Sequence, residues 1–122
     1  MNDVLNINHI NFNRTELIFE MDSSKDLNNL KPSGQMLVDS AGFSFVYLLE
    51  NNDSYTYIKI PEIYWNDLKE VLHRRIPVIV TNGKEKVYLE QFHEELTYLI
   101  ENIKGNSNYG EEMVRKIEVV FD

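Results

Sequence analysis

The segment from Phe43 to Glu50 constrains the fold most strongly, because it is apolar on both of its faces. Its alternating side chains are Phe43, Phe45, Tyr47 and Leu49 on one face, and Val46 and Leu48 on the other. A strand of this kind is typical of the middle of a sheet, where other layers cover both faces. The sequence therefore predicts a sheet with this strand near its centre.

Three hairpins are predicted from apolar alternation and turn residues. Their paired segments are Leu5–Phe12 with Leu17–Met21, Phe43–Glu50 with Tyr55–Ile60, and Pro77–Thr81 with Lys84–Leu89. In the first segment the apolar parity changes after Ile7, which indicates a β-bulge near Asn8-His9. In the last hairpin Asn82-Gly83 is typical of a type I′ turn, because both of its residues tolerate a positive φ.

Helical periodicity predicts three main helices. Their apolar stripes are Tyr64, Leu68, Val71 and Leu72; Phe92, Leu96, Leu99, Ile100 and Ile103; and Met113, Val114, Ile117 and Phe121. The first helix follows Pro61, whose ring suits a first turn, and ends near Arg75. The second ends at the C-terminal cap Lys104-Gly105, and the third begins at a capping box of Asn108 and Glu111.

The pattern is weakest between Asp22 and Gly42. A short helix from Ser23 or Ser24 through Leu30 and a short apolar segment at Gln35–Val38 are expected there, within the longest irregular stretch. The whole chain is then expected to form one α+β domain over residues 1–122. We expect an antiparallel sheet of about six strands in three hairpins, with about three helices packed on it, in the order ββ(α)ββ-α-ββ-αα.

Charge and composition exclude several function classes. The net charge is −8 over 122 residues, and phosphate backbones repel an acidic chain, so we expect no nucleic-acid partner. The chain has no cysteine, which excludes disulfides, thiolate nucleophiles and sulfur-based zinc sites. No apolar run approaches the roughly 20 residues that span a bilayer, and the N-terminus lacks a secretory signal pattern. We therefore expect a cytoplasmic protein that does not bind membranes.

The sequence carries no familiar catalytic or metal-binding pattern. His9, His73 and His93 lie far apart, and Glu90 with His93 gives only one of the two motifs that a helical di-iron site needs. No P-loop, dinucleotide-binding glycine pattern or nucleophile elbow is present. We expect no catalytic residues, no metal and no cofactor. The sequence therefore favours a protein without enzymatic activity.

Basic side chains form one local exception to the acidic charge. They are His73, Arg74, Arg75, Lys84 and Lys86. The two arginines are explained by the dipole at a helix end, and the two lysines by protection of a hairpin edge against aggregation. The functional alternative is a site for a small anion or an acidic protein.

Aromatic side chains are concentrated at Tyr55, Tyr57, Tyr64 and Trp65. Trp65 falls away from the apolar stripe of its predicted helix. Packing in the core is the simpler interpretation, whereas an exposed Trp65 would mark a contact surface, because tryptophan is enriched at interface hot spots.

Two parts of the sequence resemble a known family. The residues are Gly34 to Ser40, and Phe92 to Tyr98 continuing through Asn102 to Gly110. They resemble the YjbL family, short uncharacterised proteins of Bacillus- and Staphylococcus-type bacteria. The resemblance implies a bacterial cytoplasmic protein and supplies no catalytic residue, cofactor or substrate.

The resemblance directs attention to the polar segment 104–110. Asn106, Asn108 and Tyr109 could present a recognition surface there, beside His93 and Tyr98. Asparagine also caps helices and tolerates left-handed conformations, so part of this segment has a structural explanation.

Two functions from different classes remain open. The first is a non-enzymatic interaction or regulatory module with an unknown protein partner, or a homodimer formed through a helix face or a sheet edge. The second is a small-molecule-binding protein or small enzyme. Its pocket would be lined by His93, Glu95, Tyr98 and Tyr109, beside Asp39 and Ser40. This second function requires His93 and a carboxylate to converge on one cavity.

Overall fold

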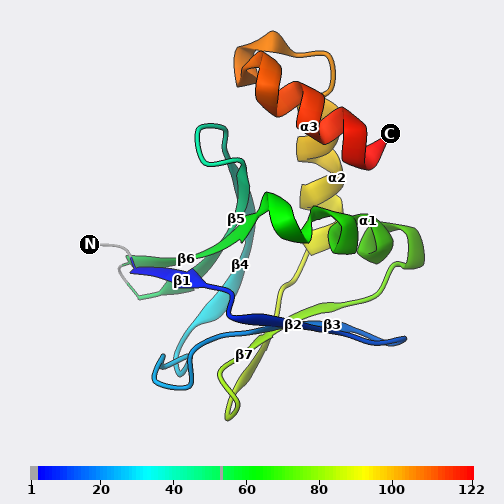
Figure 1. The fold of residues 1–122 in the computed structure, drawn as a ribbon. Helices are drawn as coiled ribbons and strands as arrows, with labels where there is room; N and C mark the ends of the chain where they lie inside the picture. Colours follow the sequence, from blue (N-terminus) through cyan, green and yellow to red (C-terminus); the bar gives the residue numbers. More distant parts are fainter. Residues whose placement is uncertain (1–2, 53) are drawn as a thin grey trace.

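The computed structural model describes residues 3–52 and 54–122, which form eight strands, three α-helices and two 3-10 turns (Figure 1). The α+β class expected from the sequence is confirmed. The single antiparallel sheet of about six strands is wrong, because these strands divide into two four-stranded sheets. Each sheet contains one parallel pair between segments far apart in the chain, and local hydrophobic patterns do not specify such pairing.

The first sheet has the strand order β1-β6-β5-β4. Its strands are β1 (Asp3–Asn6), β6 (Ser54–Pro61), β5 (Ser44–Asn51) and β4 (Lys31–Asp39). The central position predicted for the Phe43–Glu50 segment is confirmed, because β5 pairs antiparallel with both β6 and β4. β1 adds in parallel to β6, with Leu5 opposite Ile58.

The second sheet has the strand order β2-β3-β7-β8. Its strands are β2 (His9–Phe12), β3 (Leu17–Glu20), β7 (Val78–Thr81) and β8 (Lys86–Tyr88). Both hairpins are confirmed, and β3 pairs with β7 in parallel. The type I′ turn is wrong, because Gly83 has a positive φ of 95° and Asn82 does not. The Asn82 side chain instead accepts the N–H groups of Lys84 and Glu85, which closes a longer loop.

The N-terminal segment is not one bulged strand. β1 and β2 belong to different sheets, and the chain passes from one to the other at residues 7 and 8. The backbone N–H of Asn8 donates to the carbonyl of Glu20 at 2.9 Å, which starts the pairing with β3. The change of parity after Ile7 therefore marks a crossing between sheets.

The segment between Asp22 and Gly42 is more regular than expected. The helix predicted through Leu30 is wrong, because successive turns form there in which Asp22 and Asp26 accept nearby backbone N–H groups. β4 then begins at Lys31 and bulges between Pro32 and Met36. The irregular stretch thus contains a nine-residue strand at the edge of the first sheet.

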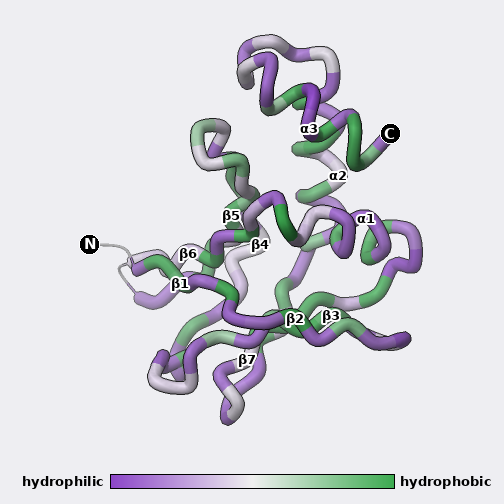
Figure 2. Tube along the Cα trace, in the orientation of Figure 1, coloured by the Kyte–Doolittle hydropathy of each residue, from purple (hydrophilic) through white to green (hydrophobic). Residues whose placement is uncertain are grey.

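The three helices are α1 (Trp65–Arg74), α2 (Phe92–Ile103) and α3 (Glu111–Phe121). The 3-10 turns η1 (Glu62–Tyr64) and η2 (Ser107–Tyr109) precede α1 and α3. Hydrophobic and hydrophilic residues alternate along α3, as in an amphipathic helix (Figure 2). Among the described residues, no helix combines the length and apolar character that a bilayer crossing requires.

Two expectations concern the ends of helices. Trp65 is fully buried at the start of α1, which confirms the simpler interpretation of core packing, and its ring packs on Phe45 and Phe121. Trp65 lies three residues before Leu68, so the two side chains share the buried face of α1. The capping box of Asn108 and Glu111 is wrong, because the N-cap of α3 is Gly110 and Asn108 lies inside η2.

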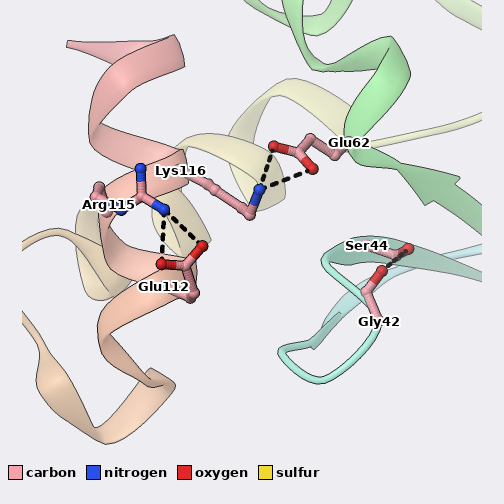
Figure 3. Close-up of polar contacts among 6 residues, drawn as sticks. All are labelled: Gly42, Ser44, Glu62, Glu112, Arg115 and Lys116. Carbon is pink, nitrogen blue, oxygen red and sulfur yellow. Dashed lines mark hydrogen bonds and ion pairs between the residues drawn. The ribbon is translucent and has the colours of Figure 1, made fainter.

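The helices lie together on one side of the first sheet (Figure 1). The sheet residues that face them are buried, among them Phe45, Tyr47, Leu49, Ile58 and Ile60. An ion pair of 3.0 Å between Lys116 and Glu62 fastens α3 to the turn before α1 (Figure 3). Residues of the second sheet, such as Phe19 on β3 and Val80 on β7, belong to the same core. The core therefore lies between the helices, the second sheet and one face of the first sheet, and the opposite face of the first sheet lies outside it.

Candidate interaction surface

The residues proposed for a small-molecule pocket lie at different places along α2. His93 is in its first turn, where Nε2 lies 2.5 Å from the carbonyl oxygen of Ile76. Tyr98 is 64% exposed. Tyr109 lies beyond the far end of α2, about 15 Å from His93 along the axis at 1.5 Å per residue. Over the described residues, His93 and Tyr109 thus do not meet in one cavity.

The polar segment 104–110 is partly used by the fold. The Asn106 side chain accepts the N–H of Asn108 at 3.1 Å and donates to the carbonyl of Asn102 at 3.2 Å. Tyr109 is half-buried and packs against the core, whereas Asn108 is exposed. Local capping therefore explains Asn106, and Asn108 remains a surface residue.

The basic residues are divided between the two ends of β7. Arg74 donates to the carbonyl of Asn13 at 3.0 Å, and its guanidinium lies 4.9 Å from the centre of the Phe12 ring. Lys84 and Lys86 follow the other end of β7, a strand about 13 Å long at 3.3 Å per residue. The structure thus uses Arg74 to hold the end of α1 against the β2–β3 hairpin.

Five clefts on the described residues have volumes between about 170 and 290 Å³. One of about 210 Å³ lies between the three helices, with Leu72, Ile100 and Phe121 in its lining and Lys69 and His73 beside them. Pockets for small organic ligands usually enclose about 300–1,000 Å³. No group of three or more metal-ligating side chains lies together in residues 3–52 and 54–122.

The clearest candidate surface is the outer face, which we define as the side of the first sheet that points away from the helices. Pairing places Val4 opposite Tyr57, Tyr57 opposite Leu48, and Val46 opposite Leu37. Its apolar members are Val4, Leu37, Val46, Leu48, Tyr55 and Tyr57. Leu37 is 52% exposed and Val4 is 46% exposed. Apolar side chains from all four strands therefore lie on this face, with Leu48 covered by its neighbours and Val4, Leu37 and Tyr55 the most exposed.

An ion pair crosses this outer face. Lys59 Nζ on β6 lies 3.2 Å from Asp39 Oδ2 at the end of β4, and both side chains are more than one-third exposed. The backbone N–H of Gly42 donates to Asp39 Oδ1 at 3.0 Å. This N–H, and then the Lys59 ammonium, lower the pKa of Asp39. Asp39 and Lys59 also share a shallow hollow of about 170 Å³ with Val4, Val46 and Tyr57.

The outer face is electrically balanced in an acidic protein. Its charged residues in the described strands are Lys31 opposite Glu50, and Lys59 paired with Asp39. Two lysines and two carboxylates cancel formally, whereas the whole chain carries −8. The excess negative charge therefore lies elsewhere on the molecule.

Sequence reasoning missed most of this surface. It singled out Asp39, Tyr55 and Tyr57, but it did not connect Asp39 with Lys59, which comes from another strand. One signal was present, because Val46 and Leu48 gave the central strand a second apolar face. That pattern predicts cover on both faces, and the helices lie on only one of them.

Comparison with known proteins gives a consistent family assignment. A family model described as "Family of unknown function (UPF0738)" matches residues 5–121. The UPF0738 protein YjbL of Bacillus subtilis is 54% identical over 91 residues, which cover 75% of each chain. A UPF0738 protein of Bacillus velezensis is 48% identical over 91% of this chain and 93% of its own length, and one of Bacillus cereus is 35% identical over 99% of each. No solved structure matches the chain. These matches confirm the resemblance to the YjbL family.

Proposed function

We propose that this chain, which belongs to the UPF0738 family, is a non-enzymatic interaction or regulatory module that binds a protein partner through its outer face. The observation that carries the proposal is the apolar surface over four strands, from Val4 on β1 to Leu37 on β4. Single exposed apolar residues are ordinary on protein surfaces. A contiguous patch is typical of a binding site, because its burial removes apolar area from water.

The kind of partner follows from charge. A surface that combines aliphatic and tyrosine side chains with balanced charges matches the core and rim of protein interfaces. The net charge of −8 disfavours phosphate backbones and anionic lipid surfaces. We therefore propose a protein partner, and the lack of cysteine supports the reducing cytoplasm as its compartment.

The geometry gives less support to a small-molecule pocket. Its proposed members His93 and Tyr109 are separated by the length of α2, and the cleft between the helices holds about 210 Å³. That volume lies below the range of about 300–1,000 Å³ that organic ligands usually occupy. The interaction function is therefore the better supported of the two.

The test is affinity capture from a cytosolic extract of the source bacterium with three forms of the protein. Leu37→Glu places a charge in the outer face, whereas Val119→Glu makes the same change on α3 at a residue that is 74% exposed. Circular dichroism first establishes that all three forms are folded. We expect the wild type and Val119→Glu to retain one partner in near-stoichiometric amount. The amount of this partner captured by Leu37→Glu should be more than about tenfold lower.

Two results would contradict the proposal. One is a wild-type protein that captures nothing above background. The other is a Leu37→Glu variant that retains the partner as well as Val119→Glu does.

A further inference from the structure

We infer that the partner at the outer face is a second copy of this chain, so that two first sheets stack face to face in a two-fold dimer. This inference rests on the proposed function, since it assigns a partner to the same surface. It differs from the edge or helix-face association expected from the sequence, because the face of the sheet, and not its edge, forms the contact.

Charge selects this face for self-association. Two copies that each carry −8 repel one another over most approaches. The outer face is different, because Lys31 offsets Glu50 and Lys59 offsets Asp39. Contact there buries the balanced part of the surface and keeps the excess negative charge of both copies at the outside.

The same face is self-complementary. In a two-fold interface one patch meets its own copy, so a patch that binds itself must present both signs of charge. Asp39 and Lys59 provide both signs at one place, and their side chains are 37% and 39% exposed. In the dimer, Asp39 of one copy can therefore pair with Lys59 of the second copy, either in place of its own Lys59 or together with it.

The apolar content suits the stacking of two sheets. Packed sheets lie about 10 Å apart and bury alternate side chains between them. Leu37 and Val4 supply such side chains from the two edge strands, and Val46 and Tyr57 supply them from the centre. The apolar pattern of β5 predicts that both of its faces are buried. In the stacked dimer the second copy would bury the outer face of this strand.

The size of the sheet limits the strength of this dimer. Four strands about 4.8 Å apart, of which the two central ones are eight residues long, give about 19 Å by 27 Å, on the order of 500 Å² for each copy. The sum of about 1,000 Å² lies at the low end of specific interfaces. We therefore expect reversible dimers with a dissociation constant in the micromolar range.

Sedimentation equilibrium of the purified full chain tests the inference, at concentrations from about 1 to 500 µM. The wild type should change from monomer to dimer over this range. Leu37→Glu should raise the dissociation constant by more than about tenfold, and Lys59→Glu should also raise it, because both remaining charges of the pair are then negative. Val119→Glu, which adds the same single negative charge as Leu37→Glu, should leave the constant within about twofold.

Each contrary result has a separate meaning. A wild type that stays monomeric overturns the dimer, and so does a Leu37→Glu variant that dimerises as well as Val119→Glu. If the wild type is monomeric and capture from the extract still depends on Leu37, the dimer fails while the proposed function holds with a different protein. If capture is also independent of Leu37, both fail.

Discussion

At the scale of single residues, Gly42 is the position on which the ion pair of the outer face most depends. A Cβ atom at this position would lie 2.5 Å from Asp39 Oδ2 and 3.3 Å from Lys59 Nζ. The backbone N–H of Gly42 also holds Asp39 Oδ1. A side chain here must therefore displace the carboxylate from Lys59.

The first prediction concerns Gly42→Ala. Because the obstructing atom ends an exposed side chain that can move, we expect the free energy of unfolding to fall by no more than about 1 kcal/mol, the usual contribution of an exposed ion pair. Urea unfolding followed by circular dichroism measures the change. In an Asp39→Ala background the same substitution should cost less, because the obstructing carboxylate is gone. An equal cost in both backgrounds would place the strain in the loop backbone and contradict this account.

Individual residues were predicted well where the local pattern decides their position. The apolar stripes of the last two helices are on the core side, with Leu96, Ile100 and Ile117 buried. The burial of Trp65 agrees with the core packing expected from the sequence, because Trp65 lies three residues before the buried Leu68 in α1. The partnership of Asp39 with Lys59 could not be predicted at all, since it depends on the pairing of three strands.

At the scale of elements, Tyr47 connects the central strand β5 to two neighbouring segments. Its hydroxyl donates to the carbonyl of Glu90 at 2.7 Å, just before α2, and accepts the N–H of Gly34 in β4 at 3.2 Å. Its ring stacks on Phe92 with centroids 6.1 Å apart. Burial raises the pKa of this phenol to about 12. The hydroxyl thus remains neutral and able to donate over the physiological range.

The second prediction concerns Tyr47→Phe. The ring packing survives, but the carbonyl of Glu90 and the N–H of Gly34 lose their partner, so the free energy of unfolding should fall by about 1–3 kcal/mol. Tyr88→Phe is the matched control, because Tyr88 is 56% exposed, and it should change stability by less than about 0.5 kcal/mol. Equal effects of the two substitutions would show that the hydroxyl of Tyr47 does not fasten these elements.

The limits of prediction differ between kinds of element. Hairpins were predicted because their two strands are joined by a short turn, as in β7 and β8. The parallel pairs join strands that are far apart in the sequence, since 47 residues separate β1 from β6 and 57 separate β3 from β7. Their pairing is decided by packing in three dimensions. For this reason the class was predicted and the division into two sheets was not.

At the scale of the whole molecule, the helices cover one face of the first sheet and leave the other face apolar and balanced in charge. The apolar pattern of β5 predicts that other elements pack on both faces of the first sheet. In this chain, other elements pack on only one of these faces. This difference between sequence pattern and structure is the basis of the proposed interaction, and it could be recognised only when both were compared.

The most direct measurement is photo-crosslinking inside the source bacterium. The photoreactive residue p-benzoylphenylalanine would replace Leu37 in one strain and Val119 in another, since both positions are exposed and apolar. We predict a discrete crosslinked protein product from position 37 and none from position 119. A product from position 119 alone, or no product from position 37, would contradict the claim that the outer face binds a protein.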